Sequence, residues 1–265
     1  MLVTESNKLK HSRIEEMNPH KNRLVDMNNQ SENEQEHFAL SGKNLGPCRE
    51  LVGNIYVLLF FVNTPLHPWS EAKRDEAIRK SWSSIDFMKK EAGRYGASVD
   101  MKVGWFEYNL PFEHDKDLKW YHTIMHDYFH SESMADLVKY YEESLHVDNA
   151  AIVFLLNSSG RSYCYMSTKE YPYWKEEFDV IYCETDFHDN FLTHELLHLF
   201  GAMDLYDYQN EGVQAIAEQF FPDSVMLRAT HVIDELTAYL IGWTKQPSPK
   251  VLQFLARTKG LRGKR

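Results

Sequence analysis

The sequence predicts an α+β fold, and two observations carry that prediction. Continuous apolar runs at Ile55–Val62 and Ala150–Leu156 are typical of strands buried on both faces of a sheet. Segments with a helical spacing of apolar residues lie between and after these runs, and one of them, beginning near Asn190, carries two histidines. A chain of 265 residues can form one such domain with a sizeable core and an extra segment, or at most two small domains.

The composition and net charge of the chain limit the classes of protein to which it can belong. Hydrophobic residues make up 43% of the chain and charged residues 26%, as in ordinary soluble globular proteins. The net charge of −10 argues against a general nucleic-acid binder. No apolar run is long enough to span a bilayer, and Met1–Lys10 lacks the apolar core of a signal peptide, so we expect a cytoplasmic protein without a membrane partner. Three cysteines are too few for a disulfide scaffold, and no pattern indicates an oligomeric state.

The ends of the chain differ from its middle. Residues 1–50 are rich in Asn, Glu, Lys, His and Ser without a recurring apolar period, which predicts a flexible or weakly helical N-terminal arm. The domain is expected to span residues 51–245. Pro247 and Pro249 open a C-terminal tail of residues 246–265.

The first elements of the domain follow from local patterns. The strand Ile55–Val62 is followed by a helix with Ser70 as its N-cap, and then by Val99–Trp105, whose alternating polar and apolar residues predict a strand with one face inward. Within residues 108–149 we expect two helices. The first carries His122, His126 and His130 at four-residue steps, which permits a second metal site but is more often a polar stripe on a surface helix.

Three further strands are expected before the histidine-bearing helix. They are the buried run Ala150–Leu156, a short polar and aromatic strand at Ser162–Thr168, and Asp179–Cys183. After that helix we expect a loop over Leu205–Phe221 and a closing helix over His231–Trp243.

The histidine-bearing helix has the spacing of a metal site. His194 and His198 lie four residues apart, so a helix places both imidazoles on one face, where they can bind one zinc ion. Glu195 lies beside them as a candidate proton acceptor. Gly201 predicts a sharp end to the helix, and the turn after it delivers Asp204, a candidate third ligand. Three fixed positions occur by chance on ordinary amphipathic helices, but five are a more specific signal.

These residues resemble a known family. The pattern His194-Glu195-x-x-His198-x-x-Gly201-x-x-Asp204 is similar to the extended zinc signature of the metzincin metallopeptidases, in the minority form with aspartate found in snapalysin and in immune inhibitor A-type peptidases. Asp223-Ser224-Val225-Met226 resembles the methionine turn of that family. The specific part of the resemblance covers residues 193–243, about a fifth of the chain.

The resemblance implies a fold and a ligand set. It implies a zincin-like metallopeptidase domain, in which a twisted mixed sheet has a backing helix, an active-site helix and a C-terminal helix. Residues 108–149 would then be a helical insertion, and Ser162–Thr168 the antiparallel edge strand beside the cleft. The implied cofactor is Zn²⁺, bound by His194, His198 and Asp204. Glu235, on the closing helix, is the alternative third ligand, as in thermolysin-like peptidases.

The ligand set implies hydrolytic chemistry. Two histidines and one aspartate leave a fourth position for water, whose pKa zinc lowers toward neutrality. Glu195 would take the proton and pass it to the leaving amine of a peptide or protein substrate. Met226 would form an apolar floor under the metal. Some members of the family have a tyrosine two residues after the turn methionine, but here Leu227 and Arg228 follow it. Arg228 is a candidate oxyanion partner or a salt-bridged structural residue. Tyr206 and Tyr208 carry the other hydroxyl groups near the motif.

Two functional classes therefore remain. The first is a zinc endopeptidase or a zinc peptidase of narrow specificity. The second is a zinc-binding regulatory or interaction protein with a metallopeptidase fold and little turnover. The presence of Glu195 favours the enzyme, since an inactive copy has no need of a base.

The N-terminal arm suggests one way in which the peptidase activity could be inhibited. Cys48 lies just before the first strand, and a thiolate can occupy the fourth zinc position in place of water. One hypothesis is that residues 1–48 cover the cleft with Cys48 on the zinc. The alternative is a buried or idle cysteine at the domain boundary.

Overall fold

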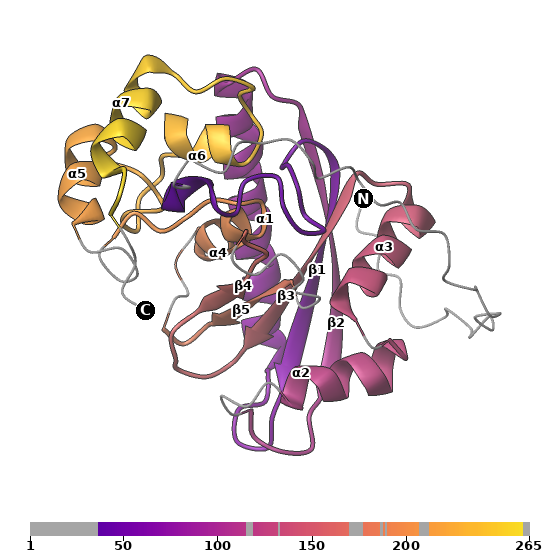
Figure 1. Cartoon of the computed structure of the whole chain (residues 1–265). Helices are drawn as coiled ribbons and strands as arrows, with labels where there is room; N and C mark the ends of the chain where they lie inside the picture. Colours follow the sequence, from indigo (N-terminus) through magenta and orange to yellow (C-terminus); the bar gives the residue numbers. More distant parts are fainter. Residues whose placement is uncertain are drawn as a thin grey trace. The chain divides into compact units, whose positions relative to one another are not determined.

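A five-stranded sheet forms the centre of the computed structural model (Figure 1). The structure describes residues 37–114, 119–131, 133–169, 177–185, 188, 190–206 and 212–261. The strand order is β2 (Val99–Asn109), β1 (Gly53–Asn63), β3 (Asn149–Leu156), β5 (Phe178–Tyr182) and β4 (Tyr163–Tyr165). The first four strands are parallel, and β4 is antiparallel to β5 at the edge of the sheet. The predicted combination of helices with a mixed sheet is confirmed, with β4 shorter than the expected residues 162–168.

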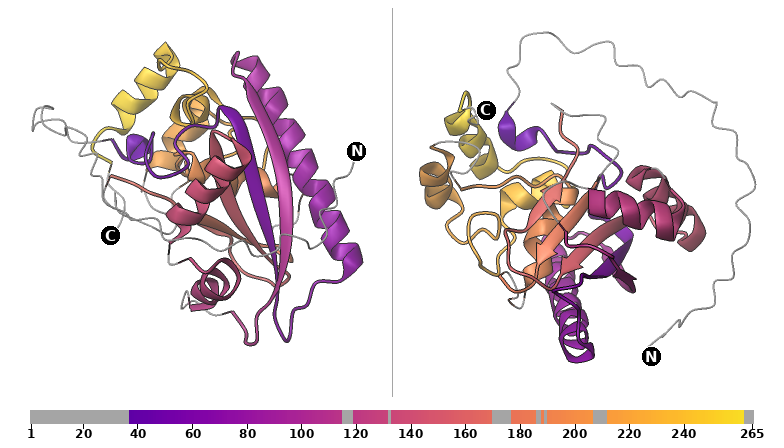
Figure 2. Two further views of the ribbon diagram at one scale, coloured as in Figure 1. Left: turned by 90° about the vertical axis from the view of Figure 1, so that its right-hand side faces the viewer. Right: turned by 90° about the horizontal axis from the view of Figure 1, so that it is seen from below.

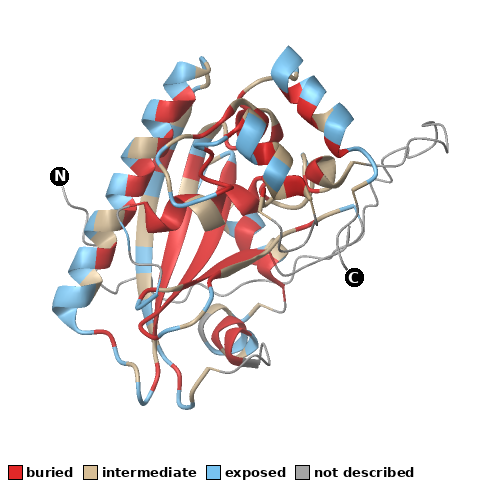
Figure 3. Cartoon of the chain, turned by 90° about the vertical axis from the view of Figure 1, so that its left-hand side faces the viewer, coloured by how far each residue is buried: buried red, intermediate tan, exposed pale blue. Residues whose placement is uncertain are grey.

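Both faces of the central strands are covered. Every residue of β3 is buried, as the continuous apolar run predicts. Alternate side chains of β1 enter two separate clusters, Ile55, Val57, Leu59 and Phe61 on one face and Leu58, Phe60 and Val62 on the other. Figure 3 shows these strands almost wholly buried, while the long helix to their left alternates between buried and exposed residues.

One long helix covers the first face. Helix α1 (Glu71–Arg94) runs along the sheet (Figure 2), and its buried stripe includes Ile85 and Met88. The hydroxyl of Ser70 accepts the Lys73 N–H at 3.3 Å, so the predicted N-cap is confirmed. Charged residues fill the other faces of α1. Among the described residues, no helix is both long enough and apolar enough to cross a membrane.

The segment between β2 and β3 covers the other face. It forms α2 (Lys119–Ile124), a π-helical turn (Met125–Phe129) and α3 (Met134–Leu145). The π-turn breaks the four-residue period, and His130 beyond it has a left-handed backbone with φ of 51°. His122, His126 and His130 are therefore not a regular row on one helix face, and all three side chains are exposed. Among the described residues, the structure does not group them as metal ligands, which favours the polar-stripe interpretation.

The C-terminal third contains more helix than expected. Helices α4 (Phe191–Leu199), α5 (Val213–Phe220), α6 (Glu235–Leu240) and α7 (Pro249–Thr258) follow β5. Helix α5 lies within the expected loop 205–221, and α6 is shorter than the expected helix 231–243. The structure also corrects the expected tail 246–265, because α7 forms there and buries Val251 and Phe254 in the core.

The structure also corrects the second half of the expected N-terminal arm. Residues 37–48, which we call the N-terminal strap, are packed and begin with a 3₁₀ turn, Phe38–Leu40. The His37 ring bonds to the Thr258 hydroxyl at 2.7 Å, and Ala39 is fully buried. After the strap, Leu51 donates to Ile241 O at 2.8 Å and accepts from the Trp243 indole at 2.7 Å. Residues 1–36 lie outside the described part of the chain.

A buried carboxyl group joins the strap to the chain around β4. Glu177 is 1% exposed, and its two oxygens accept the backbone N–H groups of Cys48 and Ser167, both at 3.0 Å. Burial raises the pKa of Glu177 to about 7, although these two hydrogen bonds act in the opposite direction. Its carboxyl group therefore stays protonated in the folded protein at pH values where it is ionised in the unfolded chain.

The raised pKa predicts a pH-dependent stability. The folded state binds the Glu177 proton more tightly than the unfolded state does, so the free energy of unfolding should fall as pH rises from 4.5 to about 7. The loss should approach roughly 3 kcal/mol, since each pKa unit is worth about 1.4 kcal/mol. Urea unfolding of Glu177→Gln with chelator present should show a shallower pH slope than wild type.

Glu143→Gln, at an exposed carboxylate of α3, is the matched control and should keep the wild-type slope. Equal slopes for wild type and Glu177→Gln would contradict the assignment.

Candidate metal centre

Three side chains converge at the end of α4. The Nε2 atoms of His194 and His198 are 3.2 Å apart, and each lies 3.2 Å from Oδ1 of Asp204. Four tetrahedral ligands with bonds of 2.0–2.1 Å lie about 3.3–3.4 Å from one another, so the three atoms have the spacing of three vertices around a zinc ion. The exposed fractions of the His194, His198 and Asp204 side chains are 22%, 10% and 13%, so the group is not sealed from solvent.

The end of α4 explains how Asp204 reaches the histidines. Gly201 has φ of +97°, and its N–H bonds His198 O at 2.9 Å, while the Ala202 N–H bonds Leu197 O at 3.1 Å. These two bonds form a Schellman motif, in which a glycine of left-handed conformation ends the helix and reverses the chain. The predicted role of Gly201 is confirmed.

Hydrogen bonds orient both imidazole rings. His194 Nδ1 lies 2.9 Å from Val225 O, and His198 Nδ1 lies 2.8 Å from Ala202 O. Because a carbonyl oxygen only accepts, each Nδ1 carries the hydrogen, so each Nε2 faces inward and is the nitrogen that could bind a metal ion. The same Schellman turn that redirects the chain thus also fixes the tautomer of His198.

A cation between these three side chains would stabilise their arrangement. Two ring nitrogens and a carboxylate oxygen face one another, and the buried Asp204 Oδ1 has the two Nε2 atoms as its polar neighbours. An unsatisfied buried acceptor is costly unless a proton or a metal ion satisfies it. Burial lowers the pKa of His198, but the charge of Asp204 and its hydrogen bond raise it more, to about 10, when no metal is bound. A proton and a metal ion would therefore compete for the same Nε2.

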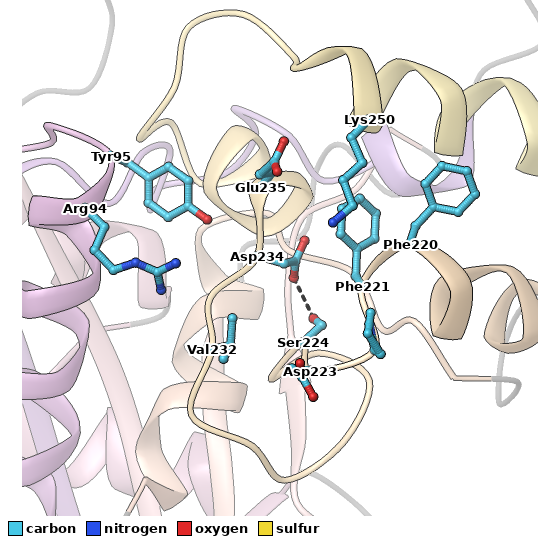
Figure 4. A pocket seen from close by; sticks show the side chains of 11 residues that line it. Arg94, Tyr95, Phe220, Phe221, Asp223, Ser224, Val232, Asp234, Glu235 and Lys250 are labelled. Carbon is cyan, nitrogen blue, oxygen red and sulfur yellow. Dashed lines mark hydrogen bonds between the residues drawn. The ribbon is translucent and has the colours of Figure 1, made fainter.

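The backbone of the turn Asp223–Met226 supports two of the three candidate ligands. Val225 O holds the His194 ring, and Met226 O accepts the Leu205 N–H at 2.9 Å, next to Asp204. Met226 itself is fully buried. Ser224 fixes the turn by accepting the Met226 N–H at 3.1 Å and donating to Asp234 at 2.6 Å (Figure 4). The role of Met226 as an apolar floor stays a prediction, and the contact that the structure gives next to Asp204 is made by its backbone.

Glu195 of α4 acts electrostatically on side chains of the candidate metal group and of the sheet. Its charge acts on His198 of α4, on Asp179 of β5 and on Cys164 of β4, and α4 packs on both strands. Asp179 is fully buried, and neither of its oxygens has a hydrogen-bond partner. Burial, with the charge of Glu195, raises the pKa of Asp179 well above its usual value. Sequence reasoning missed Asp179, although an acid within the apolar strand Phe178–Tyr182 was a visible signal.

A tyrosine also borders the group. The Tyr206 ring stacks on the His194 ring with centroids 6.4 Å apart, and its hydroxyl accepts from Arg161 at 3.3 Å. The Tyr206 hydroxyl also bonds to Asp204. Tyr206 was one of the two expected nearby hydroxyls; the other, Tyr208, lies outside the described residues.

Two other candidates, Glu235 and Arg228, lie away from the group. Glu235, the alternative third ligand, lines a pocket beside Lys250 and Phe221 (Figure 4) and accepts a hydrogen bond from Ser248. Arg228 forms an exposed ion pair with Glu218 at 3.5 Å, which favours the structural interpretation. In the part of the chain that the structure describes, the potential metal ligands that converge are His194, His198 and Asp204 alone.

Cys48 is not in this group, which corrects the inhibitory hypothesis. It is 1% exposed, and its thiol donates to Ala150 O at 3.3 Å, at the start of β3. Burial raises the pKa of Cys48 well above its usual value, so the thiolate that zinc requires is disfavoured. The alternative, a buried cysteine at the domain boundary, describes this position.

Comparison with known proteins adds no relative. No protein-family model matches the chain, and no curated protein has a significantly similar sequence.

The crowding at Gly201 predicts a specific destabilisation. A Cβ there would lie 2.7 Å from Gly42 O and 3.1 Å from the Lys43 Cα. The free energy of unfolding of Gly201→Ala should therefore fall by about 1–2 kcal/mol for the left-handed backbone and by about 1–3 kcal/mol more for overpacking. Urea unfolding in the presence of chelator measures the sum.

Gly96→Ala is the matched control. Gly96 also has a positive φ, +70°, but a Cβ there meets nothing within 4 Å. The free energy of unfolding of Gly96→Ala should therefore fall only by the amount that the left-handed backbone costs. Equal losses in the two variants would show that the contact with the strap carries no energy.

Proposed function

We propose that this chain is a zinc-dependent metallopeptidase, with His194, His198 and Asp204 as the zinc ligands and Glu195 as the general base. The observation that carries the proposal is the triangle of three potential ligand atoms 3.2 Å apart, together with the two carbonyl groups that turn both Nε2 atoms inward. Two histidines and one carboxylate are typical ligands of a catalytic zinc site, which keeps one position open.

The architecture supports the same proposal. A mostly parallel sheet with an antiparallel edge strand, the long helix α1 on one face and the histidine-bearing helix α4 agree with the metzincin resemblance of the motif. We therefore infer a zincin-like fold.

The residues have distinct chemical roles in this mechanism. A zinc ion in this site would polarise the peptide carbonyl and lower the pKa of water toward neutrality. Glu195 would accept the proton from the attacking water and deliver it to the leaving nitrogen. The carbonyl groups of Val225 and Ala202 keep the two imidazoles in one tautomer and orientation throughout.

The edge strand provides a place for substrate. β4 is the last strand of the sheet, so its outer edge offers backbone donors and acceptors to an extended peptide. Because α4 packs on β4, a peptide on this edge would pass close to Glu195.

The first prediction from this proposal concerns the metal. Wild type should bind one zinc ion per chain, and His194→Ala/His198→Ala should bind none by elemental analysis after gel filtration. Asp204→Ala should weaken zinc binding by more than about 100-fold in competition with a chelator, since losing only an outer-shell partner costs about 10–100-fold. Glu235→Ala is the matched control and should bind as wild type. Stronger zinc loss in Glu235→Ala than in Asp204→Ala would move the third ligand to α6.

The second prediction concerns the base. Glu195→Gln keeps the shape of the side chain but cannot accept a proton, so it should retain zinc and lose about 10²–10⁴-fold in kcat on a cleaved peptide. Unchanged turnover would refute the role of Glu195. A wild-type protein that binds zinc but cleaves no member of a diverse peptide library would support the zinc-binding interaction protein instead.

A further inference from the structure

The hydroxyl group of Tyr206 lies between a candidate metal ligand and a cation. Tyr206 follows Asp204 by two residues, and the planes of its ring and the His194 ring are inclined at 20°. Its hydroxyl accepts a hydrogen bond from Arg161 Nη2 at 3.3 Å and also bonds to Asp204. Arg161 belongs to a distant part of the sequence, two residues before β4. Tyr206 therefore joins the candidate metal group to the chain that enters the edge strand.

The chemistry of the three groups fixes the direction of their hydrogen bonds. A guanidinium group only donates, and a carboxylate only accepts. The Tyr206 hydroxyl has one hydrogen, and because Arg161 donates to its oxygen, that hydrogen is left for Asp204. The bonds therefore run from Arg161 through Tyr206 to Asp204. Hydrogen bonds in such a chain polarise and strengthen one another.

This donor meets a requirement that the backbone leaves open. The hydrogen bond from the Leu205 N–H to Met226 O fixes the backbone beside Asp204, but the Asp204 side chain still has two rotatable bonds. To act as a ligand it must keep Oδ1 toward the two Nε2 atoms, each 3.2 Å away. Carboxylates that bind metal ions are commonly oriented in this way by an outer hydrogen-bond donor. The Tyr206 hydroxyl is such a donor.

The direction of the bonds also separates two possible roles of Tyr206. A group that stabilises the oxyanion of a reaction must direct its hydrogen toward the substrate. The hydrogen of Tyr206 is directed toward Asp204 instead. Its contacts are therefore those of a residue that acts on the metal through a ligand.

We propose that Tyr206 is a positioning residue that holds Asp204 in its metal-binding orientation, and that Arg161 keeps the Tyr206 hydroxyl turned toward Asp204. The inference rests on the metal site of the proposed function. It adds two residues to that site, neither of which binds the metal.

The first experiment removes the hydroxyl group alone. Tyr206→Phe keeps the ring beside His194, and its zinc affinity in competition with a chelator should fall about 10–100-fold. The visible absorption spectrum of bound Co²⁺ should also change, because a reoriented carboxylate alters the geometry around the metal ion. Tyr239→Phe, which loses a hydroxyl group on α6, is the matched control and should keep the wild-type affinity and spectrum.

The second experiment tests whether Arg161 acts through Tyr206. Removing a positive charge favours the binding of a cation, so the effect of Arg161→Met alone combines two causes. The variant is therefore compared in the wild-type protein and in Tyr206→Phe. The fold-change in zinc affinity that Arg161→Met produces should differ between the two by at least about twofold, as for residues that share one hydrogen-bond network.

The outcomes separate this inference from the proposed function. Unchanged zinc affinity in Tyr206→Phe, as expected of an oxyanion donor, or an equal loss in Tyr239→Phe would overturn the role of Tyr206. Equal effects of Arg161→Met in the two proteins would overturn the role of Arg161. A wild-type protein that binds no zinc would instead remove the metal site on which both roles depend.

Discussion

The reversal of the chain at Gly201 is the constraint on which the candidate site depends. Its left-handed backbone lets Ala202 reach back to Leu197, and the carbonyl of Ala202 then orients His198. The same reversal sends the chain toward the turn at residues 223–226, where Leu205 pairs with Met226 and places Asp204 beside both histidines. A helix that continued past Phe200 would carry Asp204 away from the imidazoles, because each residue adds 1.5 Å along the axis.

The second organising feature is a pair of buried acids near the site. Glu177 is satisfied by two backbone N–H groups, whereas Asp179 has neither oxygen bonded. Burial raises the pKa of both groups, which reduces the negative charge that they add to this part of the molecule. A site that needs its acceptors to face a cation gains from this, because extra carboxylates nearby would bind a proton or a second ion. Glu177 in addition ties two distant parts of the sequence together.

Patterns in the sequence predicted what depends on local chemistry. Continuous apolar runs located β1 and β3, Ser70 located the start of α1, and the five-position motif located the converging ligands. The prolines at 247 and 249 predicted a tail in place of helix α7, although proline at the first helical position after Ser248 begins a helix well.

The features that sequence could not give depend on residues far apart. The π-turn at Met125–Phe129 alters a four-residue period without a local signature. The packing of Gly42 on Gly201, and the burial of Glu177 against Cys48, follow only once the sheet and the helices have been assembled.

The strap has a consequence for how the protein is made. A ribosome releases residues 37–48 early, but their partners on α6 and α7, Tyr239 and Thr258, are among the last described residues to emerge. The carbonyl of Val225 that orients His194 also arrives after both histidines. The strap therefore waits for most of the chain, and the ligand group cannot be complete in a growing polypeptide. Any hydrolytic activity of this site would therefore begin only after the turn that carries Val225 has left the ribosome and folded onto the two histidines.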